Sequence, residues 1–348
     1  MKIRIFFFIF FYFYLFSTPT KAINILDKEI ELFLEDIISL ITSVNKFKKE
    51  ISFTVILDDN PNAFINHENK LFISTGLIKY SESYEALVGV LAHEIGHLEN
   101  FHISKRKKSI KNLEKINQFS TLSLVAGSLI TKKNNYLVKS LISKEAGINN
   151  YYLSFSRDQE READYYGIET LEKLKLSKVP LIKFLNLLEK NSIKTGYNIE
   201  YSKFSTHPVF KERYNIIENL EKNKDIEFDY NLNVRFNYIR AKLFGFTEKE
   251  IGILDQYLKD DYLTYASSIV LSTQGKLRSS IKQLNQLLYL NNSNYFFLLE
   301  TKADILYSNG FPSEALLFYN KVINKYNDNF YIKKRIFDIK FTLNNIYD

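Results

Sequence analysis

Two histidines and a glutamate in the stretch His93-Glu94-Ile95-Gly96-His97 have the types and the spacing of a zinc site. Histidines at positions i and i+4 of a helix lie about one turn apart on one face. Both imidazoles can therefore bind a single zinc ion, and the glutamate between them can take a proton from a water molecule at that ion. The chain has only 5 histidines, so chance is a weak explanation. The alternative is a surface helix that carries the pair by accident.

A catalytic zinc site usually has three protein ligands and one position open to water. The nearest further histidine is His102, nine residues after His93. If one helix ran through both residues, a rotation of 100° per residue would place His102 on the opposite side. We therefore expect His102 to pack nearby or to hydrogen-bond a ligand, with direct binding of the metal as the alternative.

An acidic segment downstream offers a better third ligand. It contains Glu160 and Asp164 at helical spacing i, i+4, so one helix face can present both carboxylates. One carboxylate can bind zinc while the other accepts a hydrogen bond from a ligand histidine and fixes its tautomer. Glu162 points away from that face and is the fallback ligand. The alternative for the whole segment is a charged, solvated helix.

Helices and strands must position these groups. Ser81 is a plausible N-cap of the histidine helix, and Leu87, Leu91 and Ile95 recur at helical spacing. Gly89 and Gly96 inside this helix indicate close approach by another backbone, or a tolerated cost. Two strands precede it. Residues 51–57 alternate apolar and polar side chains, and residues 71–75 form a second strand whose edge is expected to pair with extended substrate.

Taken together, these motifs resemble the integral-membrane and periplasmic gluzincins. That group includes the heat-shock protease HtpX, the mitochondrial protease Oma, the CAAX-processing proteases and the BepA-like outer-membrane assembly proteases. HExxH is followed by ExxxD, with alanine before the aspartate, in the order found in that family. The strand pair before the helix and the late motif Thr206-His207-Pro208 with Arg213 are also similar. The resemblance covers about residues 30–225.

The resemblance implies a set of roles. It implies one zinc ion at His93, His97 and Glu160, with Glu94 as general base. It also places His207 and Arg213 near the metal. His207 is expected either to act as a fourth ligand that blocks the open position, or to assist catalysis together with Arg213. One departure is the loop after Phe64, where members often have a glycine-containing turn and this chain has asparagines at positions 66 and 69.

The N-terminus has the plan of a secretory signal peptide over residues 1–22. Lys2 and Arg4 precede an apolar run from Ile5 to Phe16, and Ala22 is the small residue expected before cleavage. The run is shorter than the roughly 20 residues of a spanning helix. We expect a periplasmic protein, with an N-terminal anchor in the inner membrane as the alternative. The chain has no cysteine, which excludes disulfides, a lipid-modified cysteine and a thiol protease.

Charge excludes one class of partner. The formal net charge is +7, and loss of Lys2, Arg4 and Lys21 with the signal leaves 7 − 3 = +4. This mild excess is no signature of nucleic-acid binding. A basic cluster over residues 105–115 could contact an anionic membrane peripherally, although a solvated helix face is the more common explanation.

The last third of the chain contains a repeat. Gly275 and Gly310 are 35 residues apart, and apolar residues around them match at the same offset. Each unit is expected to be a helix, a glycine turn and a helix, close to the 34-residue tetratricopeptide period. Helices near residues 229–258 should stack on these units, and the alternative is an ordinary helical bundle. A helical solenoid offers a concave surface that suits a protein partner.

The sequence therefore predicts an α+β, mostly helical chain. A signal peptide (1–22) should precede a gluzincin-type metallopeptidase domain with a small sheet (23–225) and a tetratricopeptide-like solenoid (226–348). We expect a zinc endopeptidase that acts on unfolded or misassembled envelope proteins, with the solenoid contacting outer-membrane assembly machinery. The alternative function is a chaperone or assembly factor whose protease is largely autoinhibited.

Overall fold

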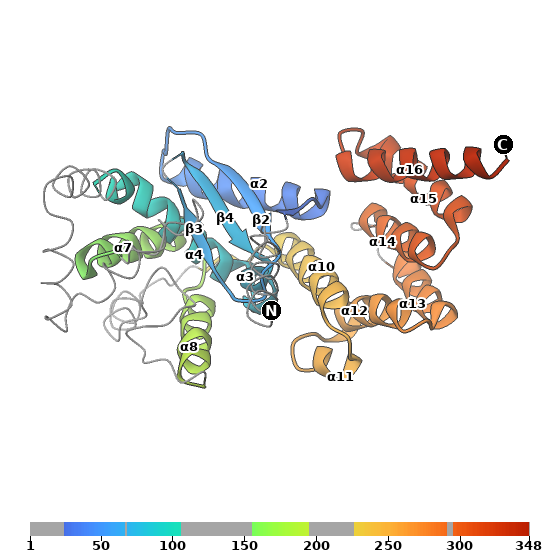
Figure 1. Ribbon diagram of the computed structural model, residues 1–348. Coiled ribbons are helices and arrows are strands. Elements are labelled where there is room, and N and C mark those ends of the chain that lie inside the picture. Colours follow the sequence, from blue (N-terminus) through green and yellow to red (C-terminus); the bar gives the residue numbers. More distant parts are fainter. Residues whose placement is uncertain (1–23, 67, 106–154, 195–225, 291–294, 348) are drawn as a thin grey trace, which may run out of the picture.

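A computed structural model describes residues 24–66, 68–105, 155–194, 226–290 and 295–347 (Figure 1). The expected signal peptide, His207, Arg213 and the basic cluster after Lys105 lie outside these residues. The described chain is mostly helical with one small sheet, which confirms the predicted fold class. Among the described helices, none combines the length and the apolar character needed to cross a bilayer.

The sheet has four short strands. Their bounds are Asn24–Ile25 for β1, Ser52–Ile56 for β2, Ala63–Ile65 for β3 and Lys70–Ser74 for β4. The order is β1-β2-β4-β3, with β2 and β4 parallel and each outer strand antiparallel to its neighbour. The expectation that β4 exposes an edge is therefore wrong, because β4 lies between β2 and β3. Strand β3 is the outer strand on this side of the described sheet.

The predicted second strand ends one residue early for a local reason. The Ser74 hydroxyl accepts a hydrogen bond from the Leu77 N–H at 3.0 Å and so caps a short helix, α3 (Thr75–Tyr80). Asn66 shapes the turn before β4, because its side-chain oxygen accepts the N–H groups of Glu68 and Lys70. Asn69 adopts a left-handed φ of 58°. The asparagine turn expected in this loop is therefore present without a glycine.

Four longer helices form one core with the sheet. They are α2 (Lys28–Val44), α4 (Tyr84–Glu99), α7 (Arg157–Lys173) and α8 (Val179–Lys194). Helix α4 is capped by Ser83 and not by Ser81, which is instead the C-cap of α3. Most of α4 is buried on all sides because α2, α7, α8 and β3 all contact it. The histidine motif thus lies on the central helix of this part.

The C-terminal region consists of successive helices. Their bounds are Tyr230–Thr247 for α10, Ile251–Leu254 for α11, Asp260–Thr273 for α12, Leu277–Leu290 for α13, Tyr295–Ser308 for α14, Pro312–Lys325 for α15 and Phe330–Tyr347 for α16. The two predicted glycine turns are present, since Gly275 (φ 76°) separates α12 from α13 and Gly310 (φ 87°) separates α14 from α15. Positive φ favours glycine at both turns. The tetratricopeptide nature of these units stays a prediction.

Helix α10 contributes side chains to two hydrophobic cores, one with the sheet and one with the C-terminal helices. Its residues Phe236, Ile239 and Leu243 are buried in the core that contains the sheet. Its residues Tyr238 and Phe244 are buried in the next core, with α12 and α13. The domain boundary predicted at residues 225/226 stays a prediction. The core that contains the sheet nevertheless includes side chains of α10, which follows that boundary.

Two buried lysines form ion pairs that link the α10 region to the N-terminal helices α2 and α3. Lys79 of α3 places its Nζ 2.7 Å from a carboxylate oxygen of Glu248, just after α10. Lys242 of α10 lies 3.0 Å from Asp27 and 2.6 Å from Glu29, at the start of α2. Both lysine side chains are almost fully buried, and a buried charge is tolerated only when it is paired. These pairs set the position of α10 against α2 and α3.

Candidate metal centre

Glycines allow helices α4 and α7 to cross at very short range. A Cβ atom added to Gly96 of α4 would lie 2.9 Å from the Cβ of Tyr166, which is too close. A Cβ added to Gly167 of α7 would lie 3.1 Å from the carbonyl oxygen of Gly89. The sequence left two explanations for the helical glycines, and the structure shows close approach. This crossing brings the acidic residues of α7 to the histidines of α4.

The start of α7 is set by a capping box. The Ser156 hydroxyl accepts the Gln159 N–H at 3.3 Å, and the Gln159 side-chain oxygen accepts the Ser156 N–H at 3.0 Å. This exchange satisfies two N–H groups at the start of the helix and fixes where it begins. Glu160 therefore lies in the first turn and Asp164 one turn later, and both are buried against α4.

Three ligand atoms converge at one buried point. The Nε2 atoms of His93 and His97 are 3.1 Å apart, and Glu160 carboxylate oxygens lie 3.5 Å from the first and 3.9 Å from the second. Zinc–ligand bonds of about 2.0–2.2 Å in a tetrahedron require ligand atoms about 3.3 Å apart. Two imidazoles and one carboxylate with these separations are a donor set that fits zinc, as the sequence predicted.

Asp164 orients the first histidine. Its Oδ1 lies 2.8 Å from Nδ1 of His93. A carboxylate accepts, so Nδ1 of His93 donates, and in the neutral imidazole the lone pair is then on Nε2. That lone pair is directed at the point shared with His97 and Glu160. The predicted role of Asp164, fixing a ligand tautomer, agrees with this geometry.

A second chain of contacts orients the other histidine. Nδ1 of His97 lies 2.9 Å from Nδ1 of His102, and Nε2 of His102 lies 2.8 Å from Oε2 of Glu162. Because Glu162 accepts, Nε2 of His102 donates, and Nδ1 of a neutral His102 accepts from His97. Burial lowers the pKa of His102, which favours this neutral form. The lone pair of His97 is then on Nε2, toward the metal.

The positions of His102 and Glu162 correct part of the sequence argument. One helix from His93 through His102 would carry His102 to the far side, but α4 ends at Glu99 and the chain turns at Phe101 (φ 58°). The turn brings His102 back beside His97 instead of to the far side. Glu162, the fallback ligand, contacts His102 and not the shared point, and its side chain is 55% exposed.

Glu94 and Phe155 are the remaining described residues of this site. Glu94 follows His93 on α4 and is buried, while His207 and Arg213 lie outside the described residues. Sequence reasoning missed Phe155, whose ring stacks on His97 with centroids 3.8 Å apart and planes at 16°. The only sequence signal was an aromatic residue directly before the α7 N-cap. Stacking on one face of the imidazole restricts its rotation and so helps to hold its orientation.

The comparisons with known proteins agree with this geometry. The sequence profile described as peptidase family M48 matches residues 26–221. The chain is 29% identical over 136 residues to the "Putative beta-barrel assembly-enhancing protease" of Vibrio cholerae, covering 38% of this chain and 27% of that protein. It is 25% identical over 134 residues to the "Beta-barrel assembly-enhancing protease" of Escherichia coli K12, with 38% and 27% covered.

A eukaryotic relative matches a longer stretch. The "Mitochondrial metalloendopeptidase OMA1" of Saccharomyces cerevisiae is 29% identical over 169 residues, which cover 47% of this chain and 43% of that protein. The chain thus spans about a quarter of the length of the two bacterial relatives and less than half of the yeast protein. The family match itself covers more than half of the chain and contains all the residues of the histidine–glutamate cluster. The chain therefore belongs to peptidase family M48, and this confirms the zinc metallopeptidase class that its motifs predicted.

Proposed function

We propose that this chain is a periplasmic zinc endopeptidase that removes unfolded or misassembled envelope proteins. The observation that carries the proposal is the convergence of His93, His97 and Glu160 on one buried point, with Glu94 beside them on the same helix. An ordinary structural cluster would not need two histidines whose lone pairs are both directed at that point by separate hydrogen-bond partners.

The chemistry follows from the residues around that point. Zinc, when bound, polarises the scissile carbonyl and lowers the pKa of a water molecule. Glu94 takes the proton of the attacking water and passes it to the leaving amine, as a general base and then a general acid. His93 and His97 bind through Nε2, and Asp164 and His102 hold their rings in place. His207 and Arg213 keep the roles that the family resemblance implies, near the metal.

Strand β3 is the proposed binding edge for substrate. It is one of the two outer strands of the described sheet, and it contacts α4, which carries the histidines. An extended peptide can add to such an edge through main-chain hydrogen bonds, with little dependence on its side chains. This mode suits unfolded clients of varied sequence. It replaces the earlier expectation for β4, whose two sides are both paired.

The envelope setting rests on relatives and on the N-terminus. Two bacterial relatives are named as beta-barrel assembly-enhancing proteases, and residues 1–22 have the plan of a signal peptide. We propose that outer-membrane proteins are among the clients and that the helical region contacts their assembly machinery.

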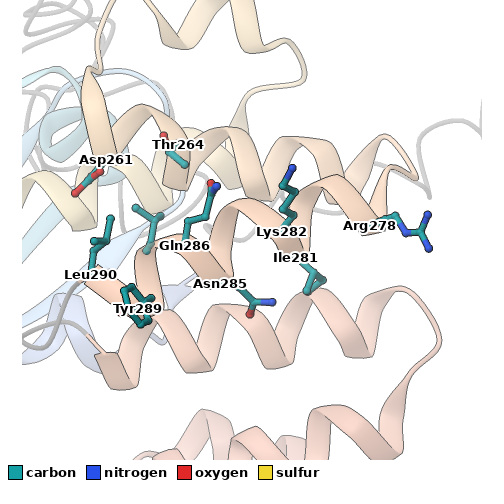
Figure 2. A pocket seen from close by; sticks show the side chains of 10 residues that line it. Asp261, Thr264, Arg278, Ile281, Lys282, Asn285, Gln286, Tyr289 and Leu290 are labelled. Carbon is teal, nitrogen blue, oxygen red and sulfur yellow. The ribbon is translucent and has the colours of Figure 1, made fainter.

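The helical region offers a groove for a partner or client. It has a volume of about 750 Å³ and runs along α13, between Arg278 at one end and Tyr289 and Leu290 at the other (Figure 2). Asp261 and Thr264 of α12 form the opposite wall. Amide, cationic and apolar side chains line it together, a mixture that suits polypeptide. This groove also favours the second candidate function, a chaperone or assembly factor that holds clients without cleaving them.

The test is a Glu94→Gln variant compared with Glu99→Gln. Both changes remove one negative charge from α4, but Glu94 is buried beside the ligands whereas Glu99 is exposed at the end of the helix. Glu94→Gln should retain zinc and cleave an unfolded test protein about 100- to 10,000-fold more slowly. Glu99→Gln should resemble the wild type in both measurements. Near-normal cleavage by Glu94→Gln would remove Glu94 from the mechanism.

The same variant tests the clients. In its native envelope, inactive Glu94→Gln protein should retain uncleaved envelope proteins that the wild type does not retain. If Glu94→Gln also restores the phenotype of a deletion strain, the chaperone function is the main one. If it does not, proteolysis is required.

A further inference from the structure

The last helix, α16, has an apolar face that nothing in the described structure covers. Phe330, Phe337 and Phe341 are 68%, 68% and 61% exposed. The rings of Phe337 and Phe341 stack on each other, with centroids 6.3 Å apart. We refer to these three residues as the phenylalanine stripe.

The stripe lies directly opposite the side by which α16 packs on α15. At 100° per residue, the three phenylalanines fall within about 20° of one direction. The side chains that pack inward fall at roughly 180–240° from it; they are Ile332, Ile336, Ile339 and Leu343. Packing against the neighbouring helices therefore uses one face of α16 and leaves the phenylalanine face outside.

Three exposed phenylalanines in line on one helix face are unusual. Single exposed apolar residues are normal on protein surfaces, but aligned ones mark interaction sites. The alignment of these three exposed rings on one helix face therefore favours a binding partner for this face.

Lysines border the stripe on both sides. Lys334 lies about 40° to one side, while Lys333 and Lys340 lie about 60–80° to the other. All three are exposed, and Asp338 is the one acidic residue on the outward half of the described helix. Long lysine side chains can place their charge beside a surface while an apolar stripe enters it.

This arrangement points to a lipid surface more than to a second copy of the chain. Two copies joined through their stripes would bring lysine rows of like charge together, which is unfavourable. A bilayer with anionic headgroups complements the lysines, and its outer hydrocarbon accepts the phenylalanines. The helix has 18 residues, about 27 Å, and is no spanning segment, so it would lie in the plane of the surface.

We propose that α16 docks the protein on an anionic membrane surface through the phenylalanine stripe and its flanking lysines. Figure 1 places α16 at the opposite end of the molecule from α7. The proposal concerns attachment and does not depend on the proposed clients.

The chain contains no tryptophan, so a single introduced tryptophan reports on one position. Phe337→Trp places the reporter in the stripe. Tyr230→Trp is the matched control, because Tyr230 is 71% exposed at the start of α10, outside the stripe. Full-length protein of each variant is mixed with vesicles of phosphatidylcholine, with or without phosphatidylglycerol, and the emission maximum is recorded.

The expected result is a blue shift for Phe337→Trp with phosphatidylglycerol vesicles and none for Tyr230→Trp. Replacing Lys333, Lys334 and Lys340 by Ser in the Phe337→Trp protein should weaken binding about fivefold per lysine. Vesicle binding without a shift at position 337 would overturn the proposal, because another segment would then be the attachment. A shift that depends on protein concentration without lipid would also overturn it, in favour of a second copy. Phe341→Trp repeats the test if Phe337→Trp folds poorly.

Discussion

Nδ1 of His97 lies 2.9 Å from Nδ1 of His102, so one of these two nitrogens must donate a hydrogen to the other. Glu162 settles the direction, because its carboxylate accepts from Nε2 of His102. His102 thereby accepts from His97, and His97 keeps its Nε2 lone pair for the metal. His93 reaches the same state through Asp164 alone. The two ligand histidines are thus oriented by different means.

Replacing His102 by Phe should lower zinc affinity about 10- to 100-fold, because His97 loses the acceptor that fixes its tautomer. Competition with a chelator measures the affinity directly. Glu162→Gln is the control for charge, since an amide oxygen can still accept from His102, and its loss should be smaller. Equal zinc affinity in the wild type and His102→Phe would show that His102 packs against His97 without orienting it for the metal.

Glu160→Gln should lose zinc more severely than His102→Phe, because Glu160 is expected to bind the metal itself. Glu162→Gln, two residues away on the same helix, should keep one zinc ion per chain. Metal analysis of the purified proteins compares the two. The reverse pattern, with zinc lost from Glu162→Gln and kept in Glu160→Gln, would show that the fallback ligand is the correct one.

Gly96→Ala should push α7 away from α4, since the added methyl group would meet the Cβ of Tyr166 at 2.9 Å. We expect the free energy of unfolding to fall by about 1–3 kcal/mol. Zinc affinity should fall as well, because Glu160 and Asp164 move with α7. Gly252→Ala is the control, because a Cβ there has no atom within 4 Å. Denaturant unfolding and zinc titration of both variants separate a local clash from a general effect of alanine.

A chain that ends at residue 225 should fold poorly, whereas one that ends at residue 249 should fold and bind zinc. The shorter chain lacks Phe236, Ile239 and Leu243, which α10 buries in the first core. Burial of such a side chain contributes about 1.5–3 kcal/mol, so losing three is a large part of a typical stability. Thermal melting and zinc content compare the two. Equal melting temperatures would show that the boundary predicted at 225/226 is also a folding boundary.

Local spacing was sufficient to predict several features of this protein. The histidine pair, the glutamate between them and the two carboxylates on α7 were identified from helical periodicity, which depends only on near neighbours. The glycine turns at positions 275 and 310 followed from the repeat, and their positive φ explains the choice of residue. The fold class followed from the same local patterns.

Relations between distant segments were decided only by the tertiary structure. Strand order placed β4 inside the sheet and β3 at its edge, which alternation of side chains cannot tell. The end of α4 at Glu99 let the chain turn and return His102 to His97, and helix length is poorly predicted from propensity. Helix α10 contributes to two cores because each of its faces meets a different set of helices, and the choice of partner for each face is a long-range contact that no local pattern contains.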